Sequence, residues 1–165
     1  MGVQALGPDR LIDIRADLVV AADGRHSTLR DSAGLQTQDV GAPIDVLWFR
    51  LARDAARHPA RTGGILRPGA MLVMLERGDY WQCAYVIPKG SLASLQQQGL
   101  DAFRQRVAAV APFLAPELRQ LAGWDDVKLL SVQITALPTW HRGGLLCIGD
   151  AAHAMSPVGG VGINL

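Results

Sequence analysis

The chain has 165 residues, and its 16 basic and 15 acidic side chains give a formal net charge of +1, which argues against a basic surface for nucleic acid or anionic membranes. Hydrophobic residues make up 49%, enough for one domain with a core, yet no apolar run reaches the roughly 18 residues of a membrane span. The histidines show no metal-binding spacing, and Cys83 and Cys147 are expected to be buried, free thiols in a reducing cytoplasm.

The N-terminal segment predicts strands followed by a short helix. Residues 3–15 alternate around a Gly-Pro-Asp turn, which favours a two-stranded β-ribbon. Residues 18–22 are continuously apolar, which is typical of a strand buried on both faces in a parallel sheet. Ser27 is suited to cap a short helix over residues 27–33, and Gly34 is suited to end it.

Asp23 and Gly24 occupy the loop between this strand and this helix. An Asp-Gly pair is commonly a hairpin turn, and that is the simpler interpretation of the two residues taken alone. A buried strand precedes the pair and a helix follows it, whereas a hairpin requires a second strand. We therefore keep this loop as a candidate binding site.

The middle of the chain has the alternating pattern of antiparallel strands. Residues 71–76 and 80–87 predict a hairpin, and residues 128–136 predict a further extended segment. Residues 45–51 also alternate, so Trp48 and Arg50 share the face opposite the apolar side chains, where they meet either a substrate pocket or solvent and neighbouring residues.

Helical spacing lies between these strands. The apolar residues from Leu100 to Leu114 recur as on one face of a helix, with Pro112 ending that helix and Pro116 suited to begin a short second one. The middle of the chain therefore predicts a mostly antiparallel sheet with helices, inserted between two pieces of a parallel-sheet unit.

A short apolar strand at residues 145–148 leads into a segment rich in glycine and other small residues. The candidate binding residues of this segment are Gly149, Asp150, Ala151, Pro157, Gly159, Gly160, Gly162 and Asn164. A carboxylate at the end of a parallel strand accepts hydrogen bonds from hydroxyl groups, and the amides of a glycine loop donate to electron-rich groups. The pattern predicts a ligand with a polyol and a region that becomes anionic, although Asp150 alone is equally suited to cap a helix. We interpret His153 as structural rather than as a proton donor.

The order Gly-Asp-Ala-Ala-His followed by Pro157, Gly159, Gly162 and Asn164 resembles the second flavin motif of the single-component FAD-dependent aromatic hydroxylases, the para-hydroxybenzoate hydroxylase-like flavoproteins. Asp23, Gly24, Ser27 and Arg30 resemble the Asp-Gly motif of the same family, which is associated with FAD and NAD(P)H binding. The resemblance implies that Asp150 holds the ribityl chain of FAD. It also implies that the Pro-Gly loop runs beside the isoalloxazine ring, whose reduced form the following helix stabilises.

The resemblance implies a mixed α/β fold, part of a GR2-type FAD-binding Rossmann-like domain. Residues 1–43 and 137–165 would belong to the FAD-binding domain, and residues 44–136 to an inserted, mostly antiparallel substrate layer. The implied reaction is monooxygenation with NAD(P)H and O2, through a flavin C4a-hydroperoxide, of an aromatic or similar small organic substrate. No side chain of the segment needs to act as acid or base. The alternatives are a related FAD oxidoreductase of the halogenase or isoprenoid reductase type, or a non-catalytic remnant.

The first motif of the family, Gly-x-Gly-x-x-Gly, binds the ADP half of FAD and does not occur in this sequence. We therefore expect an internal segment whose N- and C-terminal parts are missing. A truncated gene model, a fragment and a split polypeptide would each explain it.

The same omission predicts weak cofactor binding by the 165-residue chain on its own, because contacts to the ADP half normally supply much of the affinity for FAD. The purified chain should be colourless, and titration with FAD should show weak binding or none. A yellow protein that retains stoichiometric FAD through gel filtration would contradict this prediction.

Overall fold

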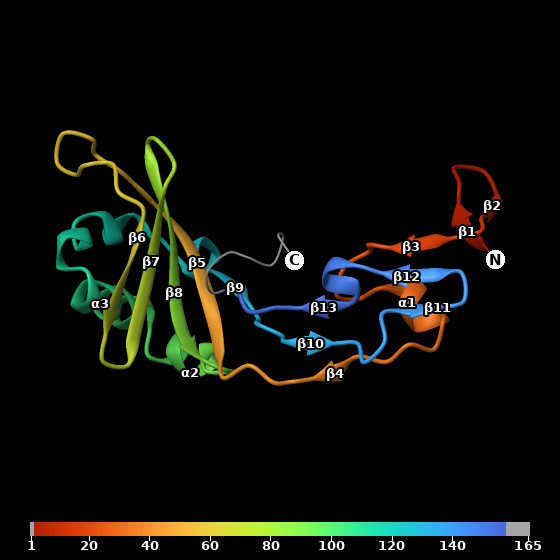
Figure 1. The fold of residues 1–165 in the computed structure, drawn as a ribbon. Helices are drawn as coiled ribbons and strands as arrows, with labels where there is room; N and C mark the ends of the chain where they lie inside the picture. Colours follow the sequence, from red (N-terminus) through yellow and green to blue (C-terminus); the bar gives the residue numbers. More distant parts are fainter. Residues whose placement is uncertain (1, 158–165) are drawn as a thin grey trace. The chain divides into compact units, whose positions relative to one another are not determined.

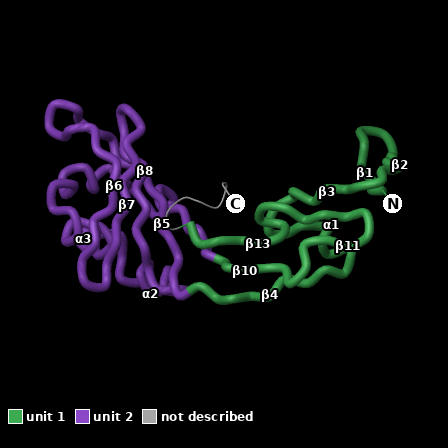
Figure 2. The backbone as a smooth tube through the Cα atoms, in the orientation of Figure 1, with its two compact units in different colours: residues 1–42, 133–165 green, residues 43–132 purple. Residues whose placement is uncertain are grey.

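The structure is a computed structural model that describes residues 2–157. The chain forms two compact units: unit 1 comprises residues 1–42 and 133–165, and unit 2 comprises residues 43–132 (Figure 2). Among residues 2–157, no helix has both the length and the apolar character needed to cross a membrane.

Unit 1 contains small sheets built from short strands (Figure 1). Its strands are β1 (Gly2–Leu6), β2 (Leu11–Arg15), β3 (Val19–Ala21), β4 (Gln38–Asp39), β10 (Thr135–Ala136), β11 (His141–Arg142), β12 (Leu145–Cys147) and β13 (His153–Ala154). The antiparallel pair β1–β2 is the expected ribbon. β3 and β12 pair in parallel in the order β11-β12-β3, as expected for the two apolar strands that are far apart in the sequence. A third sheet has the order β13-β10-β4.

The prediction that residues 18–22 form a strand buried on both faces is wrong. β3 spans only Val19–Ala21, and Ala21 is buried while Leu18 and Val20 are 56% and 47% exposed. Ala21 packs against Leu145 and Cys147 of β12, whereas the described residues leave the face that carries Leu18 and Val20 open. The apolar run therefore marks a strand with one covered face in this chain.

Unit 2 contains a five-stranded antiparallel sheet in the order β6-β7-β8-β5-β9. Its strands are β5 (Ile44–Ala52), β6 (Gly63–Arg67), β7 (Ala70–Glu76), β8 (Tyr80–Pro88) and β9 (Lys128–Leu130). The expected hairpin is present as β7–β8, in which Glu76 faces Trp81 across the turn. Strand β6 has no counterpart among the predicted elements, because its glycines have low strand propensity and only pairing with β7 orders them.

One face of this sheet is covered by helices (Figure 1). They are α2 (Leu92–Gln97) and α3 (Leu100–Val110), followed by 3₁₀ helices at Pro112–Leu114, Glu117–Gln120 and Trp124–Asp126. α3 ends before Pro112 as predicted, so Leu114 belongs to the first 3₁₀ helix and not to α3. Phe103 of α3 is fully buried and packs edge-on against Phe49 of β5 and Tyr85 of β8, with ring centroids 5.5 and 5.8 Å away. Aromatic burial of this kind anchors the core of unit 2.

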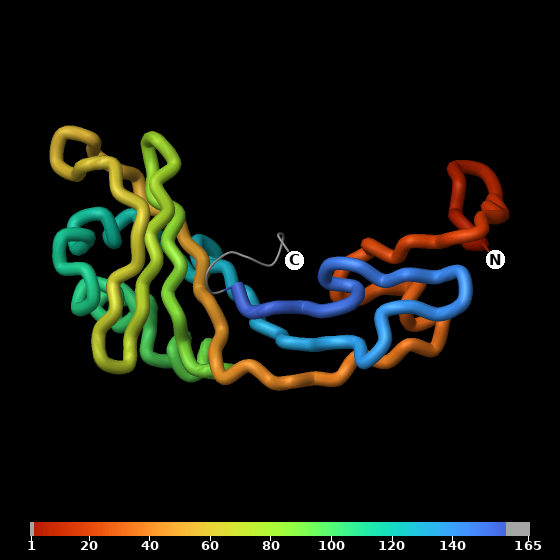
Figure 3. The backbone as a smooth tube through the Cα atoms, viewed as in Figure 1, coloured from red at the N-terminus to blue at the C-terminus, as the bar shows by residue number. Residues whose placement is uncertain are grey.

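The chain crosses between the units twice. Figure 3 shows the outgoing segment with β4 running beside the returning segment with β10, in agreement with their antiparallel pairing. Residues 128–136, expected as one extended segment, are divided between β9 in the sheet of unit 2 and β10 in unit 1. By compactness, unit 2 ends at residue 132, because β10 pairs with β4 and β13 of unit 1.

A buried carboxylate joins three backbone segments of unit 2 close to these crossings. Asp45 Oδ1 accepts hydrogen bonds from Lys89 Nζ at 2.9 Å and from the Val132 amide at 3.0 Å, and its Oδ2 accepts one from the Gly90 amide at 2.9 Å. Lys89 Nζ also donates to Val132 O at 2.5 Å. Asp45 therefore ties the start of β5 to the end of β8 and to the residue after which the chain returns to unit 1.

Candidate functional site

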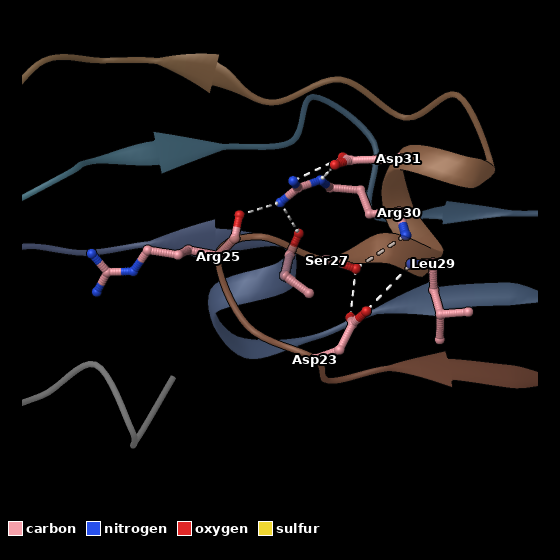
Figure 4. Close-up of polar contacts among 7 residues, drawn as sticks. Asp23, Arg25, Ser27, Leu29, Arg30 and Asp31 are labelled. Carbon is pink, nitrogen blue, oxygen red and sulfur yellow. Dashed lines mark hydrogen bonds and ion pairs between the residues drawn. The ribbon is translucent and has the colours of Figure 1, made fainter. Parts of the chain in front are cut away.

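The loop at residues 23–24 joins β3 to α1 (Thr28–Ser32) and is held by the start of that helix (Figure 4). Asp23 Oδ1 accepts a hydrogen bond from Ser27 Oγ at 2.5 Å, and Asp23 Oδ2 accepts one from the Leu29 amide at 3.3 Å. Ser27 Oγ accepts from the Arg30 amide at 3.0 Å, so Ser27 caps the helix as predicted. Gly24 has a φ of +85°, a conformation that other residues rarely adopt.

These contacts also determine the charge of Asp23. Burial acts to raise the pKa of the Asp23 carboxyl group, but the hydrogen bonds from the Ser27 side chain and from backbone amides such as that of Leu29 outweigh it. The pKa of Asp23 is therefore lowered, and the loop carries a fixed negative charge at neutral pH.

Arg30 connects this loop to the second motif. Its side chain is buried, and its Nη1 donates to Arg25 O at 3.0 Å and to Ala151 O at 3.4 Å (Figure 4). Its Nε donates to Asp31 Oδ1 at 2.8 Å, and Nη2 forms an ion pair with the same oxygen at 2.8 Å. One guanidinium therefore holds the Asp-Gly loop, helix α1 and the segment after β12 in a fixed arrangement. The expectation that Arg30 binds a cofactor directly stays a prediction.

Asp150 lies at the carboxyl end of β12, in the 3₁₀ helix Gly149–Ala151. Gly149 has a φ of +56°, which makes the sharp turn out of the strand possible. The Asp150 side chain is 47% exposed and forms an ion pair with Arg25 at 3.8 Å, so its oxygens are accessible to a ligand. Asp150 and the 23–24 loop lie beside each other because β3 and β12 are parallel neighbours and Ile148 N donates to Ala21 O at 2.9 Å.

Other residues of the second motif have structural surroundings. The Ala151 side chain is fully buried in the core of unit 1, so any contact between this residue and a ligand would come from its main chain. His153 stacks on Trp140 with ring centroids 4.9 Å apart, which supports its interpretation as a structural residue.

The remaining residues of the predicted glycine loop cannot be placed. Pro157 is the last residue that the structure describes, and the expected start of a helix at residues 163–165 lies outside the described residues. The same holds for Gly159, Gly160, Gly162 and Asn164.

No pattern in the sequence indicated two contacts of this site, the Arg25–Asp150 ion pair and the Arg30–Ala151 hydrogen bond. Both join residues that are far apart in the sequence. The fixed spacing of Arg30 within the Asp-Gly motif was a signal that this arginine matters, but it did not identify the partner.

A family model described as an FAD binding domain matches residues 3–165. The chain belongs to the FAD binding domain family. This match confirms the resemblance to flavoprotein hydroxylases that the two motifs indicated, together with the mixed α/β fold class.

Several curated relatives of this FAD binding domain chain are monooxygenases by name. It is 38% identical over 163 residues to 6-methylpretetramide 4-monooxygenase of Streptomyces rimosus, covering 96% of this chain and 38% of that protein. It is 28% identical to protoasukamycin 4-monooxygenase of Streptomyces nodosus subsp. asukaensis, covering 92% of this chain and 37% of that protein. The chain therefore spans less than two fifths of the length of these relatives.

Solved structures share the fold. The probable FAD-dependent monooxygenase pqsL of Pseudomonas aeruginosa matches with a TM-score of 0.76 at 20% identity, covering 94% of this chain and 45% of that one. HpxO of Klebsiella pneumoniae, solved with FAD and uric acid, matches with a TM-score of 0.72 at 22% identity, covering 98% and 42%.

The described residues fit the polyol part of FAD. Its ribityl chain carries hydroxyl groups, and the half-exposed Asp150 carboxylate at a strand end is a suitable acceptor for them. The two cysteines are free and buried as expected, and burial raises the pKa of Cys83 to about 12.

Proposed function

We propose that this chain is the segment of an FAD-dependent monooxygenase that binds the ribityl chain and the ring of the cofactor. In this proposal the enzyme uses NAD(P)H and O2 to hydroxylate an aromatic or similar electron-rich small molecule. The observation that carries the proposal is the accessible Asp150 carboxylate, held next to the Asp-Gly loop by the parallel strands and by Arg30. The names of the curated relatives support the same class of reaction.

The residues would act by binding and positioning rather than by proton transfer. Asp150 accepts hydrogen bonds from ribityl hydroxyls, and Arg25, 3.8 Å away, orients this carboxylate. Arg30 holds the Asp150 segment against α1 through Ala151 O, so the carboxylate stays in register with the 23–24 loop. Bound FAD, reduced by NAD(P)H, supplies the activation of O2 that such an oxygen transfer requires.

The open face of the sheet in unit 2 is proposed to contact the substrate. Trp48 and Arg50 lie on this face, opposite the residues that pack under the helices, and the Arg50 guanidinium sits 5.1 Å from the centre of the Tyr80 ring. A flat aromatic surface beside a fixed cation suits a planar substrate that carries negative charge. The free cysteines are compatible with the reducing cytoplasm expected from the sequence.

Replacing Asp150 by alanine in the full-length protein should weaken FAD binding about ten- to a hundredfold, because a hydrogen bond to a charged group is worth about 1.5–3 kcal/mol. Secondary structure should be unchanged, since Asp150 is half-exposed and lies outside the core. Flavin occupancy after gel filtration and the rate of reduction by NAD(P)H in stopped-flow experiments measure the effect.

Two aspartates of unit 1 serve as comparisons. Asp9→Ala, in the exposed turn of the ribbon, should leave flavin content unchanged. Asp23→Ala should lower thermal stability, because it removes the acceptor of Ser27 Oγ and of the Leu29 amide. Normal flavin occupancy and normal reduction in the Asp150 variant would disprove the proposed role of this residue.

A further inference from the structure

Unit 2 contains a cavity of about 250 Å³ on the helix-covered side of its sheet, away from the face that carries Trp48 and Arg50. Its lining includes His58, Arg61, Gly63, Met74, Trp81 and Phe113. An apolar cavity of about 150 Å³ suffices to bind benzene, so this one has room for one aromatic ring with a short substituent. Neither the cofactor site nor the proposed substrate face uses these residues.

Three rings form the wall of the cavity. The centroid of His58 lies 5.1 Å from that of Trp81 and 5.8 Å from that of Phe113, and Trp81 and Phe113 are 6.3 Å apart at a steep angle. These distances lie in the range of favourable aromatic contacts, which a further ring can join. His58 is held from behind, because its Nε2 lies 3.0 Å from Oε1 of the buried Glu117.

The polar character of the cavity comes mainly from Arg61. It is exposed, it carries the one guanidinium among the lining residues, and it has no carboxylate partner among residues 2–157. A guanidinium pairs best with a carboxylate, through two parallel hydrogen bonds. We propose that this cavity is a second small-molecule site of unit 2 that binds a single-ring aromatic carboxylate, with the ring against Trp81, His58 and Phe113 and the carboxylate on Arg61.

Gly63 of β6 and Val73 of β7 provide a pair of variants. Gly63 lines the cavity and lies opposite Met74, whose side chain belongs to the buried core on the helix-covered side, so a side chain at position 63 would point to the same side. Val73 precedes Met74 on β7, so its side chain points to the other face, and it is not among the lining residues. A Cβ added at Gly63 meets no atom within 4 Å, so this position accepts a side chain.

Benzoate titrated into the 165-residue chain tests the proposal, with the tryptophan indole N–H resonances as the readout. Benzoate should bind saturably and shift the Trp81 resonance most. Gly63→Leu fills the cavity and should weaken binding at least tenfold, whereas Val73→Leu should leave it within twofold. Arg61→Gln should weaken binding about ten- to a hundredfold, while Arg67→Gln, at the far end of β6 and outside the cavity, should not.

Benzamide, which has the same ring without the charge, tests the ligand class and should bind about tenfold more weakly or worse than benzoate. Absence of saturable benzoate binding to the unmodified chain would overturn the proposal. So would equal effects of Gly63→Leu and Val73→Leu, or equal binding of benzoate and benzamide. If Gly63→Leu fails to fold, the exposed Arg61→Gln substitution still tests the proposal. Benzoate binding that does not change in Arg61→Gln would contradict the proposed site.

Discussion

Replacing Asp45 by asparagine should lower the free energy of unfolding of unit 2 by about 3 kcal/mol. The substitution removes a buried negative charge and leaves hydrogen-bond donors without one of their two acceptor oxygens. The carboxylate accepts from donors at both of its oxygens, Lys89 and Val132 at Oδ1 and Gly90 at Oδ2. Asparagine keeps one oxygen and replaces the other by an NH2 group. This NH2 group is a hydrogen-bond donor and would lie against one of the donors that the carboxylate oxygen accepts from. Trp48, Trp81 and Trp124 belong to unit 2, so tryptophan fluorescence during urea unfolding reports mainly on this change.

The contribution of Asp45 to the free energy of unfolding should decrease at low pH. Burial acts to raise the pKa of Asp45, but hydrogen bonds from Gly90, Lys89 and Val132 and the positive charge of Lys89 outweigh it and hold the pKa below its ordinary value of 3.8. A carboxyl group with a lowered folded-state pKa stabilises fully above its unfolded-state pKa, and this stabilisation is lost as the pH falls through the folded-state value. The difference between the unmodified chain and Asp45→Asn should therefore be largest at neutral pH and shrink below about pH 4.

Asp101→Asn is the control for Asp45. Asp101 lies in the same unit but is exposed, and its partner Arg104 is three residues along the same helix, so its removal should leave stability nearly unchanged. An Asp45 variant whose stability deficit is the same at pH 3 and at pH 7 would show that the charge of this carboxylate is not responsible.

Replacing Arg30 by methionine should lower the free energy of unfolding of unit 1 by about 2–3 kcal/mol, since it removes charge-assisted hydrogen bonds to Arg25 O and Ala151 O. Arg30→Lys should lose most of the same stability, because an ammonium group cannot reproduce the planar fork that serves several acceptors at once. Trp140 is the tryptophan of unit 1 and stacks on His153, two residues after Ala151, so its fluorescence reports on this region.

Arg10→Met, in the exposed turn of the ribbon, is the matched control and should leave the unfolding curve unchanged. The proposed role of Arg30 also predicts a change in hydrogen exchange. The Arg30→Met variant should show faster hydrogen exchange at the Ala152 amide, which donates to Gly149 O at 2.9 Å, than the unmodified chain does. Unchanged exchange at Ala152 would show that Arg30 does not hold the segment after β12.

Local patterns in the sequence determined most of the secondary structure of this protein. Alternation over residues 45–51 predicted β5 and its two faces, and Pro112 ended α3 because it has no amide to donate. Ser27 capped α1 because its hydroxyl accepts from an amide three residues later. Each of these features depends on neighbours within a few residues, and for that reason the sequence predicts them. The motifs likewise placed Asp23 and Asp150 at strand ends.

Only the tertiary structure decided which of these pieces meet. The Arg30 side chain reaches Ala151 O across 121 residues of sequence, and no local pattern encodes that partner. Strand β6 forms because it pairs with β7. The exposure of one face of β3 depends on which residues pack against each of its two faces. The division of residues 128–136 between two units followed from competing pairings with β5 and β4. Pairing and packing are decided by the free energy of groups distant in the chain, and these become neighbours only when the chain folds.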